Sequence, residues 1–257
     1  MTKISKSYDQ WLWNSYAQVY DLMAEHNPAY QNVIKQVLDT LSNLSPPPSG
    51  ILFDIGAGTG NFSIAVAKRF PQLSIRHIES NDEMNQKAME KANSARLCNW
   101  SVQALDYDTD WPNDSTDIAI MIHTLYTSKN SQRVLTKLYN TLVPSGILIL
   151  CDVGRVIDTN DWALFLFREN LRRIGILRTL RLFVQGRVVA RANRIIAAKQ
   201  RAGEYWTHSL SELCEAITGS GFVVVESSVT YQGYSDFVIA RKKSINQIQN
   251  RPRLGTL

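Results

Sequence analysis

The chain has 257 residues, of which 44% are hydrophobic and 20% charged, the balance of an ordinary globular protein. This length allows one large domain with a substantial core. The net charge of +5 is too small to indicate a nucleic-acid-binding protein. No apolar run reaches the roughly 20 residues of a membrane-spanning helix, and the polar, aromatic start is unlike a secretion signal, so we expect a cytoplasmic protein.

Cysteine and histidine spacing favours neither a disulfide framework nor a metal centre. The three cysteines, Cys98, Cys151 and Cys214, lie far apart and form no CxxC pair. The four histidines form no HxxH or HExxH pattern. We therefore expect no metal ion.

Two helices are predicted before residue 45. Apolar side chains recur at spacings of three and four between 11 and 23 and again between 33 and 41, which is the periodicity of an amphipathic helix. Asn27-Pro28 separates the two segments, with Pro28 suited to the first turn of the second helix. The proline-rich segment 45–50 acts as a stiff connector, so residues 1–45 are predicted to form a helical flap.

From residue 50 onward, short apolar runs alternate with helical segments. The expected strands are 51–55, 73–78, 100–104, 118–122 and 147–151, and the expected helices are 61–69, 82–95 and 131–142. This alternation predicts a parallel sheet with helices on both faces.

The end of the chain departs from that alternation. A helix is expected at 210–220, but the two following strands, 222–229 and 236–241, have no helix between them and should form an antiparallel hairpin. The predicted fold class is therefore α/β: a seven-stranded, mostly parallel, doubly wound sheet ending in an antiparallel hairpin. Residues 50–152 and 205–243 would form the core, and 153–204 a helical cap inserted into it.

Three glycines follow the first strand, in Phe53-Asp54-Ile55-Gly56-Ala57-Gly58-Thr59-Gly60. Glycines permit a sharp turn close to a ligand, and the next helix offers free N–H groups at its N-terminus. A dinucleotide site of the GxGxxG type needs its third glycine at position 61, which is Asn61 here. Asp54 before the loop would repel a phosphate, so the loop favours a cationic ligand.

Two further acidic residues follow the second and third predicted strands. Glu79 ends the second strand, where a carboxylate can accept both hydroxyls of a ribose. Asp106 follows the third strand, where it can accept a hydrogen bond from an adenine amino group. Their order along the chain, after the glycine loop, favours a nucleoside ligand.

These segments resemble the motifs of the class I S-adenosylmethionine (SAM)-dependent methyltransferases. Residues 53–60 are similar to the first motif of that family, 78–84 to its ribose-binding motif and 105–106 to its adenine motif. Residues 116–125 and 138–151 are similar to its fourth- and fifth-strand regions. The resemblance implies SAM as the cofactor, with an aromatic N-terminal helix over it. The cofactor residues it implies are Asp54, Gly56, Gly58, Gly60, Glu79, Ser80, Met84, Leu105, Asp106, Tyr16 and Tyr20.

Methyl transfer is an in-line displacement that needs alignment and exclusion of water, and a general base only when the acceptor must lose a proton. His123 is the candidate base because it follows the fourth strand and titrates near neutrality; local packing is the alternative. Tyr126 and Asp152 are candidate substrate-binding residues. The structural alternative is that Tyr126 only covers the cleft and that Asp152 caps the next turn.

The segment from Arg155 to Arg201 holds ten arginines and one lysine but only three acidic residues. Three hypotheses remain: a lid over the acceptor, a site for an anionic acceptor, or a face that rests on an anionic membrane. The arginines scatter around a helix instead of keeping to one face, which disfavours the membrane hypothesis and nucleic-acid binding. Gly175 and Gly186 are expected breaks in this helix.

The sequence thus predicts a methyltransferase that acts on an oxygen or nitrogen of a small molecule in specialised metabolism, with no nucleic acid as partner. The alternatives are an RNA or protein methyltransferase, or a non-catalytic protein that binds SAM or a dinucleotide. A homodimer stays open.

Overall fold

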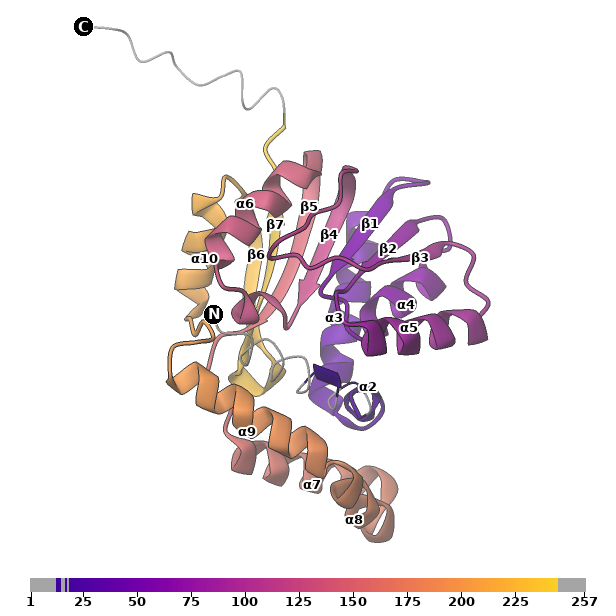
Figure 1. Ribbon diagram of the computed structural model, residues 1–257, viewed down its shortest axis with the longest axis vertical. Helices are drawn as coiled ribbons and strands as arrows, with labels where there is room; N and C mark the ends of the chain where they lie inside the picture. The colour runs from indigo at the N-terminus through magenta and orange to yellow at the C-terminus, as the bar shows by residue number, and fades with distance from the viewer. Residues whose placement is uncertain (1–12, 15–16, 18, 245–257) are drawn as a thin grey trace, which may run out of the picture.

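A computed structural model describes residues 13–14, 17 and 19–244 of the chain. Its centre is a seven-stranded sheet in the order β3-β2-β1-β4-β5-β7-β6 (Figure 1). The strands are β1 (Ile51–Ile55), β2 (Ser74–Ile78), β3 (Trp100–Gln103), β4 (Thr116–Ile122), β5 (Leu142–Val153), β6 (Val223–Thr230) and β7 (Ser235–Arg241). The first five strands pair in parallel, and β7 pairs antiparallel with both β5 and β6. The predicted fold class, including the terminal hairpin, is confirmed.

The helices follow the strands in the predicted alternation. They are α2 (Asp21–His26), α3 (Pro28–Leu44), α4 (Asn61–Arg69), α5 (Asp82–Ser94), α6 (Ser131–Thr141), α7 (Thr159–Ile174), α8 (Ile176–Gln185), α9 (Arg187–Arg201) and α10 (Leu210–Gly219). Two short 3₁₀ turns, η1 (Leu125–Thr127) and η2 (Tyr231–Gly233), follow β4 and precede β7. None of the helices in the described part of the chain is long and apolar enough to cross a membrane.

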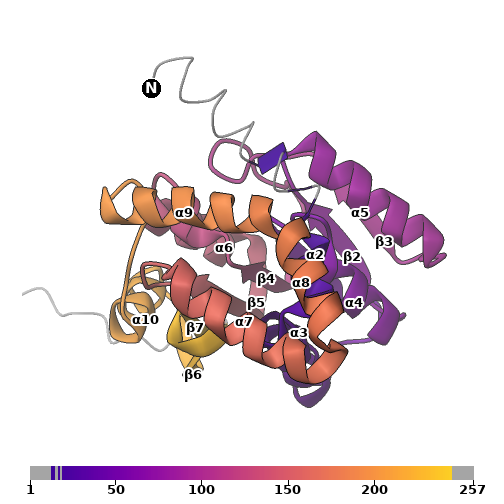
Figure 2. The same cartoon turned by 90° about the horizontal axis from the view of Figure 1, so that it is seen from below.

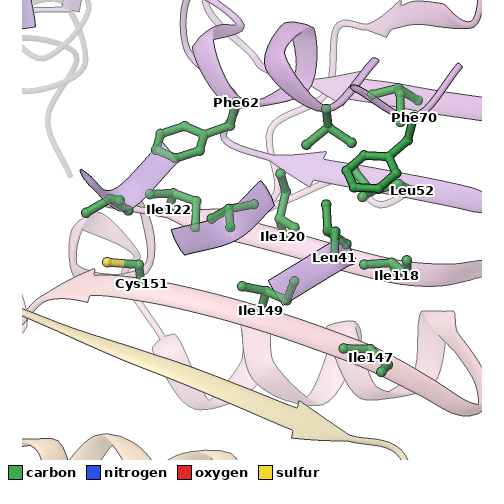
Figure 3. Close-up of a cluster of buried hydrophobic side chains, with 14 of the residues drawn as sticks. Leu41, Leu52, Phe62, Phe70, Ile118, Ile120, Ile122, Ile147, Ile149 and Cys151 are labelled. Atoms are coloured by element: carbon green, nitrogen blue, oxygen red, sulfur yellow. The ribbon is translucent and has the colours of Figure 1, made fainter. Parts of the chain in front are cut away.

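One face of the sheet is covered by α3 and α4. The isoleucines of β4 at 118, 120 and 122 point to this face, where they meet Leu41 of α3 and Phe62 of α4 (Figure 3). The alternate residues Ala119 and Met121 point to the other face, against α6 and α10. This period of two is the pattern of a strand buried on both sides.

The start of α3 is fixed by its sequence. The side-chain oxygen of Asn27 accepts hydrogen bonds from the N–H groups of Ala29 and Tyr30, and Pro28 occupies the first helical position. Residues 28–44, assigned to a flap from the sequence, thus form a helix whose apolar side chains pack on the sheet.

The helices α7, α8 and α9 form an insert between β5 and α10. The breaks fall at Gly175 and Gly186, as the sequence predicted. Gly175 has φ of +77°, a conformation that glycine adopts without a steric penalty. Figure 2 shows α7 and α9 as two long helices with α8 connecting them, and Figure 1 shows all three beyond one end of the sheet. The division into flap, core and cap domains stays a prediction.

One strand begins earlier than the sequence indicated. The prediction started the fifth strand at residue 147, after the Pro-Ser-Gly segment, whereas β5 begins at Leu142. Leu142 pairs with Thr116 of β4 before an irregularity in the register. This pairing joins residues far apart in the chain, so no local pattern contains it.

Candidate active site

The glycine loop between β1 and α4 is held close to the end of β4. Gly56 has φ of +66°, and a Cβ added there would lie 2.1 Å from Cγ2 and 2.9 Å from Oγ1 of Thr124. The N–H groups of Gly56 and Ala57 donate to the carbonyl of Ile78. Gly58 and Gly60 also have positive φ. The loop therefore requires glycine for both its backbone conformation and its close packing.

Glu79 links this loop to the end of β2. Its Oε2 accepts from the N–H of Gly58 at 3.0 Å, and its Oε1 accepts from the N–H of Asn81 at 2.9 Å. Burial raises the pKa of Glu79, while these N–H groups act to lower it. Oε1 also accepts from Ser80 Oγ at 3.5 Å, which leaves Oε2 with capacity for a further donor. The two hydroxyls of a ribose are donors of the required kind.

Asp54 lies beneath the loop. Its side chain is buried, and its Oδ2 accepts a hydrogen bond from the N–H of Ser63 in the first turn of α4 at 3.0 Å. Burial raises the pKa of Asp54 to about 7, partly offset by the Ser63 N–H and reinforced by the negative charge of Glu79. Asp54 thus fixes α4 against β1, and a positively charged ligand nearby would favour its ionised form.

Apart from Tyr20, the other predicted cofactor residues described by the structure follow β2 and β3 or lie in the first turn of α5. The sulfur of Met84 lies 3.5 Å from the position of a Cβ on Gly58. Ser80 is exposed beside Glu79, and Leu105 is partly buried against the core. Asp106 Oδ1 accepts from the N–H of Asp108. Tyr16 lies outside the described residues. We call the glycine loop, Glu79 and the residues around it the cofactor edge.

A polar cluster connects α2 to the cofactor edge. Lys91 Nζ of α5 donates to Asp21 Oδ1 at 2.7 Å, to Asn61 Oδ1 at 2.8 Å and to Thr59 Oγ1 at 3.2 Å. Thr59 Oγ1 donates to Asp21 Oδ1 at 2.7 Å. Asn61 occupies the position where a dinucleotide loop would have glycine, and here its side chain accepts a hydrogen bond from Lys91.

A cavity of about 360 Å³, the acceptor cavity, lies between this region and the insert. Predicted residues Tyr20, His123 and Tyr126 line it, together with aliphatic and aromatic side chains of α7, α8 and α9. Its polar wall residues include Asn193 and Arg194 from α9. A mostly apolar cavity with a few polar groups is typical of a small-molecule site.

His123 is partly buried, lines the acceptor cavity and has φ of +53°. Its Nε2 lies 3.1 Å from Ser235 Oγ and 3.6 Å from Cys151 Sγ. Burial lowers the pKa of His123 to about 4, so the imidazole is neutral at physiological pH. The neutral ring is the form that can accept a proton.

Two aromatic residues that sequence reasoning missed complete this wall. The ring centroids of Tyr231 and His123 are 4.5 Å apart, and those of Trp162 and Tyr231 are 4.6 Å apart. Asn27 Nδ2 donates to the hydroxyl of Tyr231. The sequence signal that could have indicated Tyr231 was the aromatic Tyr-Gln-Gly-Tyr turn of the hairpin. In the structure, Tyr231 and Gln232 of this turn both adopt positive φ.

Asp152 lies in a buried charged cluster instead of facing the cavity. Its Oδ2 is 3.4 Å from Nε2 of His208, whose Nδ1 is 3.3 Å from Oδ2 of Asp236, the residue paired with Asp152 across β5 and β7. Arg155 also pairs with Asp236. Although burial acts to lower it, the two carboxylates raise the pKa of His208 to about 9. The cluster fixes the chain where it leaves and re-enters the sheet.

A family model described as a methyltransferase domain matches residues 24–227. The chain belongs to this family of SAM-dependent methyltransferases. Among curated proteins, an N-methyltransferase from Aspergillus nanangensis is 28% identical over 138 residues, which are 52% of this chain and 34% of that protein. A carboxy-S-adenosyl-L-methionine synthase from Helicobacter pylori strain P12 is 26% identical over 155 residues, 56% of this chain and 62% of that protein. The chain thus spans between a third and two thirds of these relatives.

Solved structures share the fold of this methyltransferase family member. The magnesium protoporphyrin IX methyltransferase of Synechocystis PCC 6803 with bound S-adenosylhomocysteine (SAH) has a TM-score of 0.60 at 15% identity, covering 93% of this chain and 95% of that one. The [4+2]-cyclase SpnF has a TM-score of 0.62 at 14% identity, covering 91% and 96%. A fold shared by a methyltransferase and a cyclase does not determine the reaction.

The residues of this methyltransferase family member fit SAM, the cofactor of the family. Gly56 leaves no space for a side chain, the partly buried Glu79 can accept ribose hydroxyls, and Asp54 favours positive charge. Among the described residues, no group of three or more histidine, cysteine or acidic side chains is arranged to hold a metal ion.

Proposed function

We propose that the protein transfers a methyl group from SAM to an oxygen or nitrogen of a small, largely apolar molecule bound in the acceptor cavity. The volume of about 360 Å³ suits a small molecule, and the lining from α7 to α9 is rich in aliphatic and aromatic side chains. We also propose that the acceptor belongs to specialised metabolism. The match to the N-methyltransferase relative covers only 52% of this chain, so that relative does not identify the acceptor.

The observation that carries the proposal is the contact between cavity and cofactor edge. His123 lines the cavity, and the next residue, Thr124, touches the glycine loop, where its Oγ1 donates to the carbonyl of Gly56 at 3.2 Å. A molecule in the cavity would therefore lie next to a ligand held by that loop. This adjacency is what an in-line transfer between two bound molecules requires.

Bound SAM would supply an electrophilic methyl group on a sulfonium. The glycine loop and Glu79 would bind the nucleoside part, and the aromatic wall of Tyr231 and Trp162 would orient the acceptor and exclude water. His123 is proposed to accept the proton that the acceptor loses, in the neutral form set by its pKa of about 4. Ser235 Oγ, at 3.1 Å from Nε2, would orient the ring.

The test is SAM turnover against a library of alcohols, phenols and amines, with SAH and methylated product detected by mass spectrometry. His123→Ala should lower kcat by roughly 100-fold or more while SAM binding stays intact, since positioned bases contribute about 10²–10⁴-fold. Arg133→Ala, at an exposed position of α6 outside the cavity lining, is the control and should retain kcat. Unchanged kcat in His123→Ala would remove His123 as the base.

The pH profile gives a second readout. Because the base form of His123 persists down to about pH 4, kcat should stay flat between pH 6 and 8 and fall only under acidic conditions. SAM binding without SAH formation across the library would favour a non-catalytic protein. Methylation of RNA or protein but of no small molecule would favour an RNA or protein methyltransferase.

A further inference from the structure

The helix α8 carries a row of exposed aliphatic side chains. Leu177 is 80% exposed, Leu180 50% and Val184 59%. Their spacings of three and four residues place them on one face of the helix. Of the eleven large apolar residues that are exposed in the described part of the chain, seven lie between Leu164 and Val188. A concentration of this kind is typical of a binding surface.

The opposite face of α8 is apolar as well. Leu182 and Phe183 line the acceptor cavity, and the ring of Phe183 lies 5.6 Å from that of Phe167 in α7. Apolar side chains thus lie on both the inner and the outer side of α8, where Arg178 and Arg181 interrupt them, and apolar helix faces are normally buried. Yet the helices against which α8 packs are α7 and α9, and Figure 1 shows α8 at the end of the molecule far from the sheet. Its outer face therefore lacks a covering layer within the described chain.

The surroundings of this face are strongly basic. Residues 170–203 contain eight arginines and one lysine, and no aspartate or glutamate. Arg178 and Arg181 of α8 are exposed, as are Arg187 and Arg191 at the start of α9. Arg181 lies one turn from both Leu177 and Val184 on the helix. The scatter of arginines inferred from the sequence was counted over the whole segment, whereas α8 alone places Arg181 beside its exposed leucines.

We propose that the outer face of α8, with its flanking arginines, binds the surface of an anionic lipid bilayer. Aliphatic side chains next to arginines match the two parts of such a surface, acyl chains below and negative headgroups above. A second copy of the chain fits less well, since pairing two acid-free segments would bring like charges together. Single-stranded nucleic acid stacks on aromatic rings, whereas the exposed apolar residues of α8 are all aliphatic.

This docking would place α8 between the bilayer and the acceptor cavity. Leu177 and Val184 would enter the interface, while Leu182 and Phe183 would remain in the wall of the cavity. The proposal does not depend on methyl transfer, so its failure and that of the proposed function are distinguishable.

The experiment is sedimentation of the full chain with vesicles of phosphatidylcholine alone and of phosphatidylcholine mixed with phosphatidylserine. The protein should partition into the anionic vesicles and much less into the neutral ones. The double variant Arg178→Gln/Arg181→Gln should lower that partition by about 30-fold, from about 1 kcal/mol for each arginine. The charge-matched control Lys129→Gln/Arg133→Gln, on the surface of the core, should not.

The double variant Leu177→Ser/Leu180→Ser should lower the partition by about 10-fold or more. Its control is Val225→Ser/Val229→Ser on the edge strand β6, where the side chains are similarly exposed, at 60% and 51%. All variants should bind SAM as the unmodified protein does, which shows that they are folded.

Equal binding to both vesicle types, no binding to either, or binding that the α8 variants leave unchanged would overturn the proposal. A dimer seen by light scattering and lost in Leu177→Ser/Leu180→Ser would also overturn it, in favour of a second copy. Salt-dependent RNA binding lost in Arg178→Gln/Arg181→Gln, without vesicle binding, would favour nucleic acid.

Discussion

The cofactor edge draws on segments that directly follow β1, β2 and β3, whereas the acceptor cavity is lined by side chains from α2, η1, the three insert helices and η2. The cofactor edge depends largely on backbone: the N–H of Gly58 donates to Glu79, those of Gly56 and Ala57 donate to the carbonyl of Ile78, and Gly56 must lack a side chain. The acceptor cavity depends on side-chain rings, such as those of Trp162 and Tyr231.

This difference suggests that the two regions tolerate change differently. A backbone site fails when a Cβ is added where the chain has positive φ and no free space, as at Gly56. A cavity walled by side chains can change its shape through substitution while the fold persists. One cofactor can thus serve many acceptors within one fold.

The largest expected effect on SAM affinity comes from adding a side chain to the glycine loop of the cofactor edge. Gly56→Ala should weaken SAM binding by at least roughly 100-fold, because its Cβ would meet Thr124 at 2.1 Å and the residue has φ of +66°. Isothermal titration with SAM measures the loss. Gly175→Ala, with φ of +77° and no neighbour within 4 Å, carries similar backbone strain and should retain affinity.

Rescue would identify the clash as the cause. Adding Thr124→Ala to Gly56→Ala removes the two closest atoms, Cγ2 and Oγ1, and should restore part of the affinity. If Gly56→Ala binds SAM normally, the loop does not contact the cofactor closely and the comparison between the two regions is wrong.

The same difference explains what the sequence predicted. β1 and α4 were placed with their observed bounds, because a strand, a glycine loop and a helix are consecutive and each has a local pattern. Glu79 was found because it ends a strand next to that loop, and it does bind the loop. The start of β5 was missed, because its pairing with Thr116 is long-range.

The acceptor cavity was only partly predictable for the same reason. His123 and Tyr126 follow β4, and the end of a strand marks them as candidates. Trp162 and Tyr231 are 69 positions apart and meet only because the insert folds back over the hairpin. Asp152 also ends a strand, but its partner His208 comes after the insert, so its burial in an ion cluster has no local signal.

A pH-dependent change in stability tests the buried ion cluster of His208, Asp152 and Asp236. His208 has a folded-state pKa of about 9, above its usual 6.5, so its contribution to stability is fully present below pH 6.5 and is lost as the pH rises through 9. The shift corresponds to roughly 3 kcal/mol. Urea unfolding should show the free energy of unfolding falling by that order between pH 6.5 and 9.

His208→Gln keeps hydrogen-bonding capacity but no charge, and should remove most of this pH dependence. Its SAM affinity near neutral pH should match that of the unmodified protein, because Asp152 and Asp236 lie away from the glycine loop in a separate cluster. An unchanged pH slope in the variant would show that the cluster does not hold a charged histidine.

The smallest of the three effects isolates a single side chain of the cofactor edge. Glu79→Ala should weaken SAM binding by roughly 1.5–3 kcal/mol, because a charged hydrogen-bond acceptor is lost and the N–H groups of Gly58 and Asn81 lose their partner. Glu90→Ala, an exposed carboxylate of α5 that pairs with Gln86, is the matched control and should bind SAM normally. Equal affinity of the two variants would remove Glu79 from the cofactor site. A loss in Glu79→Ala alone would show that the cofactor edge needs this carboxylate as well as its glycine backbone.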